Sequence, residues 1–196
     1  MLKISLEERK DYIAKFASKV FSKKGYQAAS LNDVSRAAKI SKAGTYYYFK
    51  SKEEILSYIL IKASDQFLEK LKLTIKKNQE KELTPQESIK KLMEVYAKHV
   101  NNNKDKRLLV LRERHQSTGR NKKALFIREQ EIFRLLRSEL QKIPNLEKGI
   151  NHNVITFLFI SMSHWLGYWF KEGRELKIEE IIAQNIRVFF NGILKK

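Results

Sequence analysis

The segment of residues 30–54 constrains the fold of this chain more than any other part of the sequence. It contains two short helical patterns on either side of a tight turn, followed by four consecutive aromatic residues. Ser30 is placed to cap the first helix, and Asp33, three residues later, is its expected capping-box partner. The apolar residues that follow recur at helical spacing: Leu31, Val34, Ala37 and Ala38. These signals predict a short helix that starts beside Ser30.

A second short helix is predicted immediately after the turn. Ser41 can cap a helix running over about residues 42–48. At about 100° per residue, one side of this helix carries Lys42, Ala43, Tyr46 and Tyr47, and the other carries Thr45 and Phe49. Two short helices joined by such a turn are typical of the helix-turn-helix, whose second helix enters the major groove of DNA. One side can therefore read DNA while the other packs.

The residues around this pattern resemble one family. The run SKAGTYYYFKSKEEIL resembles the signature SKxxxYxxFxxKxxL of TetR-type transcriptional regulators, and the preceding AKFASKVFSKKGYQAASLNDVSRAA is similar to that family's first helix, Gly-Tyr stop and second helix. The likeness covers roughly the first quarter of the chain. It departs at Lys39, where the family most often has glycine. A left-handed non-glycine residue costs roughly 1 kcal/mol, so we expect a slightly reshaped turn.

The resemblance implies which residues contact DNA. Lys42, Ala43 and Tyr46 match positions that approach base edges, and Tyr47 and Tyr48 match positions near phosphates, although Tyr48 could equally pack under the domain. The complete predicted DNA-binding set is Ser30, Lys42, Ala43, Gly44, Tyr46, Tyr47, Tyr48 and Lys52. The last of these matches the lysine that holds the DNA backbone at the start of the next helix, where backbone amides also favour phosphate.

Composition and charge agree with a DNA-binding protein. The net charge is +18 and the pI is about 9.9, which indicates a polyanionic partner, although a solvated lysine-rich surface accounts for much of the charge. The absence of cysteine excludes a disulfide scaffold and fits a cytoplasmic protein. No glycine-rich phosphate loop, GxSxG elbow or HExxH run is present, and the histidines are scattered. We therefore expect no enzyme, no catalytic residues, no metal site and no cofactor.

Few prolines and glycines, together with long periodic segments, predict an all-α fold. It would comprise an N-terminal three-helix helix-turn-helix DNA-binding domain over residues 1–50 and a larger helical ligand-binding and dimerisation domain over residues 51–196. Residues 1–8 are polar and soon charged, unlike a signal peptide. The uncharged run over residues 149–170 contains asparagine, histidine, serine and threonine, so a buried helix fits it better than a membrane span.

The last two predicted helices, over about residues 151–171 and 178–194, carry more apolar surface than a chain of this size can cover. We expect them to pair with a second copy in a four-helix interface about a twofold axis, and the family resemblance implies the same homodimer. A dimer also suits helix-turn-helix recognition, because two such helices read successive half-sites of a palindromic operator.

The run SMSHWLGYWFKEG is similar, more loosely, to a TetR subgroup whose members respond to acyl-CoA thioesters. Arg128 falls within the apolar stripe of a helix predicted over about residues 122–143, where a cation needs an anion, a carbonyl or a ligand phosphate. The alternative is that Arg128 snorkels or pairs with a glutamate such as Glu113. The predicted effector-binding residues are Arg128, His164, Trp165 and Trp169, of which His164 and Trp165 could instead belong to an interface.

The sequence thus predicts a ligand-responsive transcriptional regulator. We expect a repressor that a small hydrophobic effector, such as an acyl-CoA, releases from a double-stranded DNA operator, although activation is also open. The alternative is a helix-turn-helix protein that acts through a protein partner or coats nucleic acid with low specificity, without sensing a small molecule. The helix that begins beside Ser51 is expected to couple the two domains.

Overall fold

The computed structural model describes residues 5–101, 109, 113–170 and 175–194, except for the side chains of residues 167–169. Within these ranges every regular element is a helix, which confirms the predicted all-α fold. No helix in the described ranges is long and apolar enough to cross a membrane. The sequence also predicts a helix over about residues 105–116, most of which lies outside the described ranges, and residues 114–116 form the short 3₁₀ helix η1 (Arg114–Gln116).

The chain folds as two compact units. The first comprises residues 1–64 and 104–126, and the second comprises residues 65–103 and 127–196. The long helix α4 (Lys52–Glu80) contributes to the core of each, through residues 55–60 and 67–75 respectively. The predicted functional boundary after residue 50 stays a prediction. α4 contributes to both units, and so does the helix over residues 119–140, through Leu125 in the first core and Ile132 in the second.

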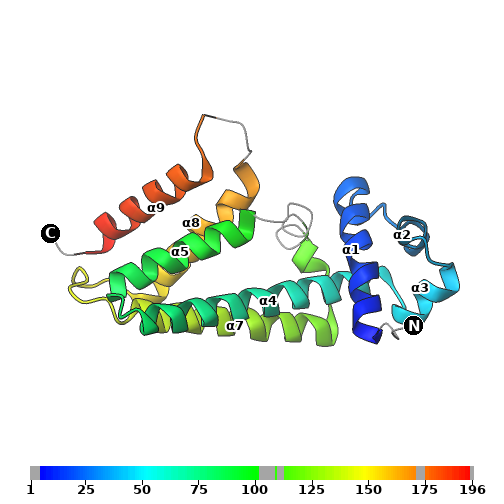
Figure 1. The fold of residues 1–196 in the computed structure, drawn as a ribbon, viewed down its shortest axis with the longest axis horizontal. Helices are drawn as coiled ribbons and strands as arrows, with labels where there is room; N and C mark the ends of the chain where they lie inside the picture. Colours follow the sequence, from blue (N-terminus) through cyan, green and yellow to red (C-terminus); the bar gives the residue numbers. More distant parts are fainter. Residues whose placement is uncertain (1–4, 102–108, 110–112, 171–174, 195–196) are drawn as a thin grey trace. The chain divides into compact units, whose positions relative to one another are not determined.

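The first unit is built mainly from three helices and the beginning of α4 (Figure 1). The three are α1 (Leu6–Lys24), α2 (Leu31–Ala38) and α3 (Lys42–Tyr48). Gly25, with φ of 85°, ends α1, and Ser30 and Asp33 form the predicted capping box of α2. The Ser41 hydroxyl accepts a hydrogen bond from the Gly44 amide at 3.0 Å and so caps α3. The helix-turn-helix predicted from the sequence is therefore present.

The turn between α2 and α3 has a left-handed residue at the position where the sequence departs from the family pattern. Lys39 adopts φ of 53° and ψ of 42°, and its amide bonds back to the Arg36 carbonyl at 3.2 Å. The next amide, of Ile40, bonds to the Ser35 carbonyl at 3.0 Å. These two bonds close α2 in the manner of a helix C-cap that usually has glycine. Lys39 thus adopts the left-handed conformation in which a non-glycine residue is strained, and whether the turn is reshaped stays a prediction.

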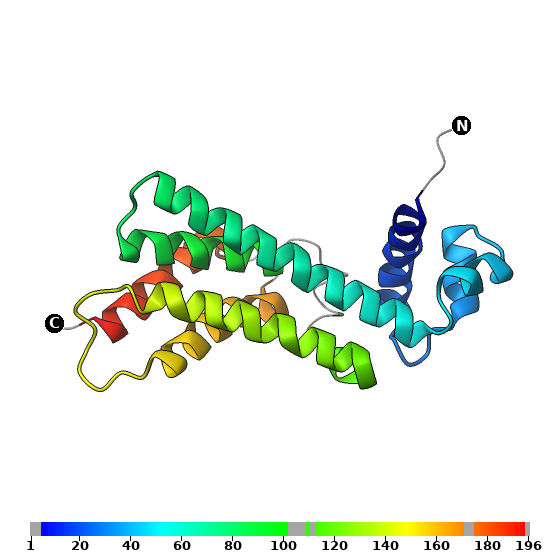
Figure 2. The ribbon, with the colours of Figure 1, turned by 90° about the horizontal axis from the view of Figure 1, so that it is seen from below.

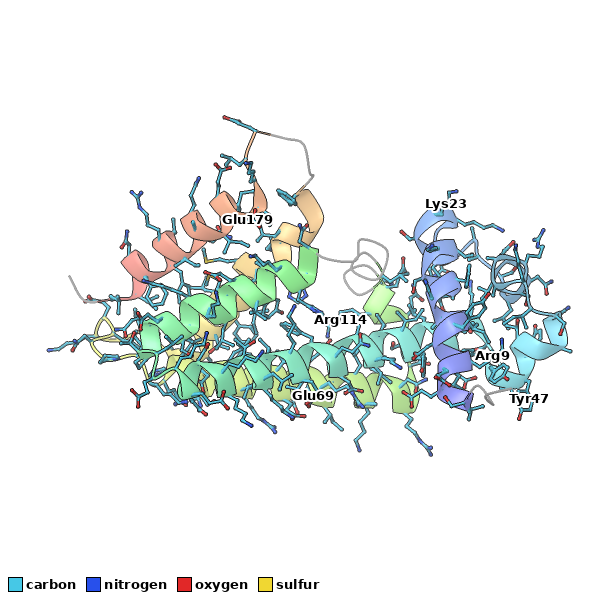
Figure 3. The ribbon with its side chains drawn as sticks, in the orientation of Figure 1. Arg9, Lys23, Tyr47, Glu69, Arg114 and Glu179 are labelled. Carbon is cyan, nitrogen blue, oxygen red and sulfur yellow. The ribbon has the colours of Figure 1, made fainter. Side chains whose placement is uncertain are left out.

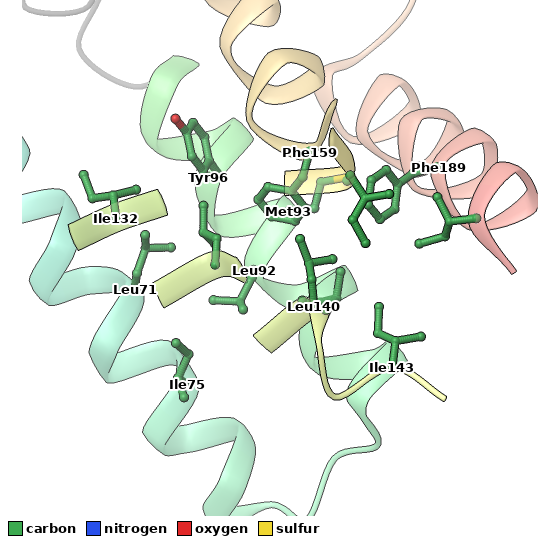
Figure 4. Close-up of a cluster of buried hydrophobic side chains, with 14 of the residues drawn as sticks. Leu71, Ile75, Leu92, Met93, Tyr96, Ile132, Leu140, Ile143, Phe159 and Phe189 are labelled. Carbon is green, nitrogen blue, oxygen red and sulfur yellow. The ribbon is translucent and has the colours of Figure 1, made fainter. Parts of the chain in front are cut away.

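The second unit is a helical bundle in which α4, α5, α7 and α8 lie alongside one another (Figures 1 and 2). The helices not yet given are α5 (Pro85–Asn101), α7 (Gly119–Leu140), α8 (His152–Trp169) and α9 (Ile178–Ile193). The bundle core includes Leu71, Leu92, Met93, Leu136, Leu140, Phe159 and Phe189 (Figure 4). α9 packs through Ile181 and Ile182 against Ala97 of α5 and Leu166 of α8.

α7 begins and ends three residues earlier in the chain than the predicted helix over about residues 122–143. It begins at Gly119 and ends at Leu140, although Pro144 was expected to end it at residue 143. The amides of Lys142 and Ile143 bond only three residues back, to Glu139 and Leu140, at 3.1 and 3.2 Å. The last turn therefore tightens before the proline, which disfavours α conformation in the residue that precedes it.

Replacing Lys39 with glycine should stabilise the first unit by up to about 1 kcal/mol, because glycine adopts the left-handed conformation without the steric cost of a Cβ atom. Lys39→Ala is the matched control, since it removes the charge and keeps the Cβ. Urea denaturation of the full chain should show a higher midpoint for Lys39→Gly than for either wild type or Lys39→Ala. Equal midpoints for the two variants would show that the turn is unstrained.

Candidate DNA-binding site

α3 has one exposed side and one buried side, as the helical spacing predicted. Lys42, Ala43, Tyr46 and Tyr47 are exposed, and the Tyr47 side chain, which is 70% exposed, projects into solvent (Figure 3). Thr45 is fully buried in the first unit. Phe49, which follows the helix, is also fully buried and meets the ring of Tyr58 at 5.5 Å. The exposed side thus presents one cationic and two aromatic side chains on a helix that the other side holds in place.

Tyr48 and Gly44 lie between these two sides. Tyr48 is half-buried against the core of the first unit, and its ring meets that of Tyr47 edge-on at 4.9 Å. At Gly44 a Cβ atom would lie 2.8 Å from Ile40 Cγ2 and 3.0 Å from Ser41 Oγ. Local packing therefore accounts for glycine at this position without DNA. DNA contact at either residue stays a prediction.

Ser30 is exposed at the start of α2, where a small polar network surrounds it. Its hydroxyl donates to Asp33 Oδ2 at 2.7 Å, and Lys24 Nζ reaches the same oxygen at 2.8 Å. Arg36 pairs with the other oxygen, Oδ1, at 2.8 Å. The hydrogen bonds from Lys24 and then Ser30 hold the pKa of the Asp33 carboxyl well below its usual range. The carboxyl therefore stays ionised, and Lys24 and Arg36 offset its charge beside a surface expected to meet phosphate.

Lys52 occupies a different environment from the one the resemblance implies. Its Nζ donates to the carbonyl oxygens of Tyr26, Gln27 and Ala29 at 3.0, 2.9 and 3.1 Å. It also lies 4.8 Å from the centre of the Tyr26 ring. An ammonium group has three protons, and here each faces a carbonyl oxygen of the loop between α1 and α2. Lys52 thus fastens this loop to α4, and a phosphate contact at Lys52 stays a prediction.

The exposed charge of the first unit is strongly basic. One further carboxylate of the unit is paired: Asp11 accepts hydrogen bonds from Tyr58 at 2.9 Å and Lys62 at 2.6 Å. The exposed cations in the described part of α1 to α3 and the turn after it are Lys15, Lys19, Lys23, Lys24, Arg36, Lys39, Lys42 and Lys50. Such a surface attracts a polyanion and releases counterions on binding it.

The predicted effector residues lie in the second unit and take three different environments. Arg128 on α7 forms a bidentate pair with Asp65 on α4, at 2.5 Å from Nε and 3.1 Å from Nη2. This is the acidic partner that the alternative interpretation predicted, although it is an aspartate and not a glutamate such as Glu113. His164 Nδ1 lies 2.9 Å from the Tyr96 hydroxyl. Trp165 is 59% exposed. Trp169 has its side chain outside the described part of the structure.

Around Tyr96 the bundle gathers polar and aromatic groups that sequence spacing did not reveal. Phe67 of α4 meets the Tyr96 ring at 4.6 Å and stacks on His99 at 4.4 Å. Burial, and then the Glu129 carboxylate of α7, raise the pKa of the Tyr96 hydroxyl. These residues and His164 come from four helices, so only the tertiary packing could bring them together. We call Phe67, Tyr96, His99, Glu129 and His164 the Tyr96 cluster.

Comparison with family models assigns the chain. Residues 13–59 match the model described as bacterial regulatory proteins, tetR family. Residues 82–193, more than half of the chain, match the model described as tetracyclin repressor-like, C-terminal domain. The chain therefore belongs to the TetR family of bacterial regulatory proteins.

Curated relatives are similar over shorter stretches. YuxN of Bacillus subtilis, an uncharacterized HTH-type transcriptional regulator, is 30% identical over 100 residues, which cover 51% of this chain and 33% of YuxN. IcaR of Staphylococcus epidermidis, a negative regulator of the biofilm operon icaADBC, is 46% identical over 46 residues, which cover 24% of this chain and 25% of IcaR. The matches thus span about a third or less of these relatives' lengths.

Solved structures share the fold over nearly the whole chain. AibR, in complex with isovaleryl coenzyme A and operator DNA, superposes with a TM-score of 0.81 at 22% identity, covering 92% of this chain and 97% of AibR. PfmR of Thermus thermophilus superposes with a TM-score of 0.79 at 24% identity, covering 94% of this chain and 99% of PfmR. At these identities the similarity establishes the fold.

Replacing Lys52 with methionine should lower the melting temperature, because three loop carbonyls lose their donor. Affinity measured at several salt concentrations gives the slope of log K against log[salt], which tests the predicted phosphate contact. Loss of that contact would reduce the slope by about 0.9, whereas an unchanged slope would show that Lys52 acts only within the protein. Lys50→Met is the control for stability, since Lys50 Nζ donates to a single carbonyl, of Tyr46 at 3.1 Å.

Proposed function

We propose that this chain is a homodimeric DNA-binding transcriptional repressor that a small hydrophobic effector releases from a palindromic operator. The observation that carries the proposal is α3, whose exposed side presents Lys42, Tyr46 and Tyr47 from a basic unit. Family membership and the regulators among the relatives support it, and IcaR, a negative regulator, supports repression. A protein with this role acts in the bacterial cytoplasm, where the chromosome lies.

In the proposed complex, Lys42, Ala43 and Tyr46 approach base edges, and Tyr47 and Tyr48 lie near phosphates. Lysine and tyrosine side chains supply hydrogen-bond donors for base edges, and the tyrosine rings add flat apolar surface that suits the methyl groups of bases. Ser30 and Gly44 lie beside them, in the first turns of α2 and α3. The basic surface supplies the salt-dependent share of the affinity.

The proposed dimer forms through α8 and α9. Both helices keep large apolar side chains exposed in the described part of the chain, and a set of this size calls for a partner surface. These are Val154, Phe157, Leu158 and Trp165 on α8 and Val188 on α9. A twofold axis between two copies would place two α3 helices on two half-sites of one operator.

The proposed effector binds in the second unit, near the Tyr96 cluster and Arg128. The cluster offers aromatic surface with hydrogen-bonding groups, which fits a ligand that is mostly apolar and has a polar end. AibR, a structure of the same fold, is bound to isovaleryl coenzyme A, which supports acyl-CoA thioesters as the class to test. An anionic ligand would compete with Asp65 for the Arg128 guanidinium, and His164, Trp165 and Trp169 remain proposed contacts.

Release from DNA would then follow from a population shift. The effector would favour a conformation of the second unit in which the two α3 helices of the dimer no longer match successive major grooves. The proposed coupling element is α4, because it follows α3 directly in the chain and supplies residues to the cores of both units. α7 also supplies residues to both cores, through Leu125 and Ile132.

Replacing Tyr46 with alanine should abolish sequence-specific DNA binding and leave the dimer intact. Tyr12→Ala is the matched control, because Tyr12 is a tyrosine of the same unit with nearly equal exposure, 41% against 40%. Fluorescence anisotropy with DNA that flanks the chain's own gene measures the binding, and sedimentation velocity measures the dimer. Loss of dimerisation in Tyr46→Ala would contradict the division of roles. Equal, weak binding of every DNA sequence by wild type would support a low-specificity binder.

Replacing Arg128 with glutamine should weaken release by acyl-CoA and leave operator affinity unchanged. The same anisotropy assay is run with acetyl-, octanoyl- and palmitoyl-CoA and with free coenzyme A. Lys72→Gln is the matched control, because Lys72 pairs with Glu131 at 3.0 Å across the same two helices, α4 and α7. Partly exposed pairs of this kind contribute little stability, so both variants should fold.

Release of the wild-type protein from DNA by acyl-CoA thioesters of one chain length would establish acyl-CoA as the class of effector. An unchanged response in Arg128→Gln would remove Arg128 from the effector site. Specific DNA binding that no thioester weakens would support the role as a transcriptional regulator and would exclude acyl-CoA thioesters as its effectors.

A further inference from the structure

We propose that a buried hydrogen bond between Ser35 of α2 and Thr45 of α3 fixes the rotation of α3 and so determines how sharply the protein distinguishes its operator from other DNA. The inference rests on the proposed function, in which α3 reads DNA. It adds a specificity-determining pair that contacts no base itself. Both residues belong to the first unit.

α3 has few other contacts that hold its orientation. It is seven residues long, about two turns, and an isolated helix of that length is not stable in water. Among its residues, all of which are described, Thr45 alone is buried. Phe49 anchors the end of the helix but lies beyond it. Tyr48 is half-buried against the core of the first unit. The rotation of α3 about its own axis therefore depends chiefly on what holds Thr45, its one fully buried residue.

The Thr45 hydroxyl has a specific partner on the neighbouring helix. Ser35 Oγ donates to Thr45 Oγ1 at 2.9 Å, and both residues are buried. Ser35 Oγ also lies 2.9 Å from the Leu31 carbonyl oxygen, and Thr45 Oγ1 lies 3.3 Å from the Ser41 carbonyl oxygen. The two hydroxyl groups thus tie α2 to α3 one residue before Tyr46, which is proposed to approach base edges.

This arrangement allows the tie to be removed without leaving a buried polar group unpaired. In Thr45→Val the shape of the side chain is kept, and the Ser35 hydroxyl can still donate to Leu31 within its own helix. In Ser35→Ala the Thr45 hydroxyl can still donate to Ser41. Neither variant leaves a buried hydroxyl without a hydrogen-bond partner, so the first unit should stay folded. What each variant loses is the directional bond between the helices.

A small rotation is enough to impair base reading. A recognition site has to be held within about 10–20° of its productive geometry. Phosphate contacts tolerate such a change better, because long cationic side chains and diffuse charge carry most non-specific affinity. Loss of the tie should therefore lower specific affinity far more than non-specific affinity.

The test compares two DNA duplexes: one that the wild-type protein selects from a random library, and a scrambled duplex of the same composition. Anisotropy is measured at one salt concentration, below the melting temperature of every variant. We expect Thr45→Val to bind the selected duplex about tenfold more weakly, the scale of one mismatched base pair, and the scrambled duplex as wild type does. Ser35→Ala should behave alike, and the double variant should be no worse than Thr45→Val.

Two matched variants separate this role from general stability. Thr45→Ser keeps the hydroxyl and removes only the methyl group, so it should keep the wild-type ratio of selected to scrambled affinity. Ser18→Ala removes another buried hydroxyl of the same unit, which donates only within α1, to the Ala14 carbonyl at 2.9 Å, and should leave the ratio unchanged.

An unchanged ratio in both Thr45→Val and Ser35→Ala would overturn the proposal, as would equal weakening for both duplexes. A lowered ratio in Thr45→Ser would also overturn the proposal, because the ratio would then not depend on the hydroxyl. If Thr45→Val does not fold, Ser35→Ala carries the same test. A wild-type protein that selects no sequence would instead contradict the proposed function itself, and this is distinguishable because it appears before any variant is made.

Discussion

The short helix α3 cannot hold its own conformation, and so the proposed site depends on the packing of its buried side. An isolated helix of two turns is unstable in water. Thr45 and Phe49 supply the anchors, and the core formed by α1, α2 and α4 receives them. The loop before α2 is in turn fastened to α4 by Lys52, through three carbonyl oxygens. The exposed residues of α3 are thus positioned by side chains whose observed partners lie within the protein.

The charged side chains of the first unit also fall into two groups, those paired within the protein and those exposed to solvent. Two carboxylates of the first unit are paired within the protein: Asp33 with Lys24 and Arg36, and Asp11 with Lys62. The remaining exposed cations are left to meet a polyanion. Such charge supports affinity without selecting a sequence, and selectivity has to come from the geometry of α3.

In the second unit, polar and aromatic groups gather around Tyr96 in the bundle, and a partly exposed ion pair joins α4 to α7. Arg128 falls on the core-facing stripe of α7, and Asp65 of α4 satisfies it there. The Tyr96 cluster joins four helices in one region of the same unit. Since α4 contributes to it through Phe67 and also enters the core of the first unit, a ligand in the bundle has a continuous helix through which to act.

The all-α fold, the caps at Ser30 and Ser41, the bounds of α3 and the side it exposes could all be predicted from the sequence, because they depend on local signals and helical period. The sequence also singled out Lys39, whose left-handed conformation is a property of a single residue. The partners of Lys52, Arg128 and Thr45 lie 10 to 63 residues away in the chain, and they emerged only from the folded structure. Periodicity shows that a side chain turns inward, whereas its partner is chosen by how distant helices pack.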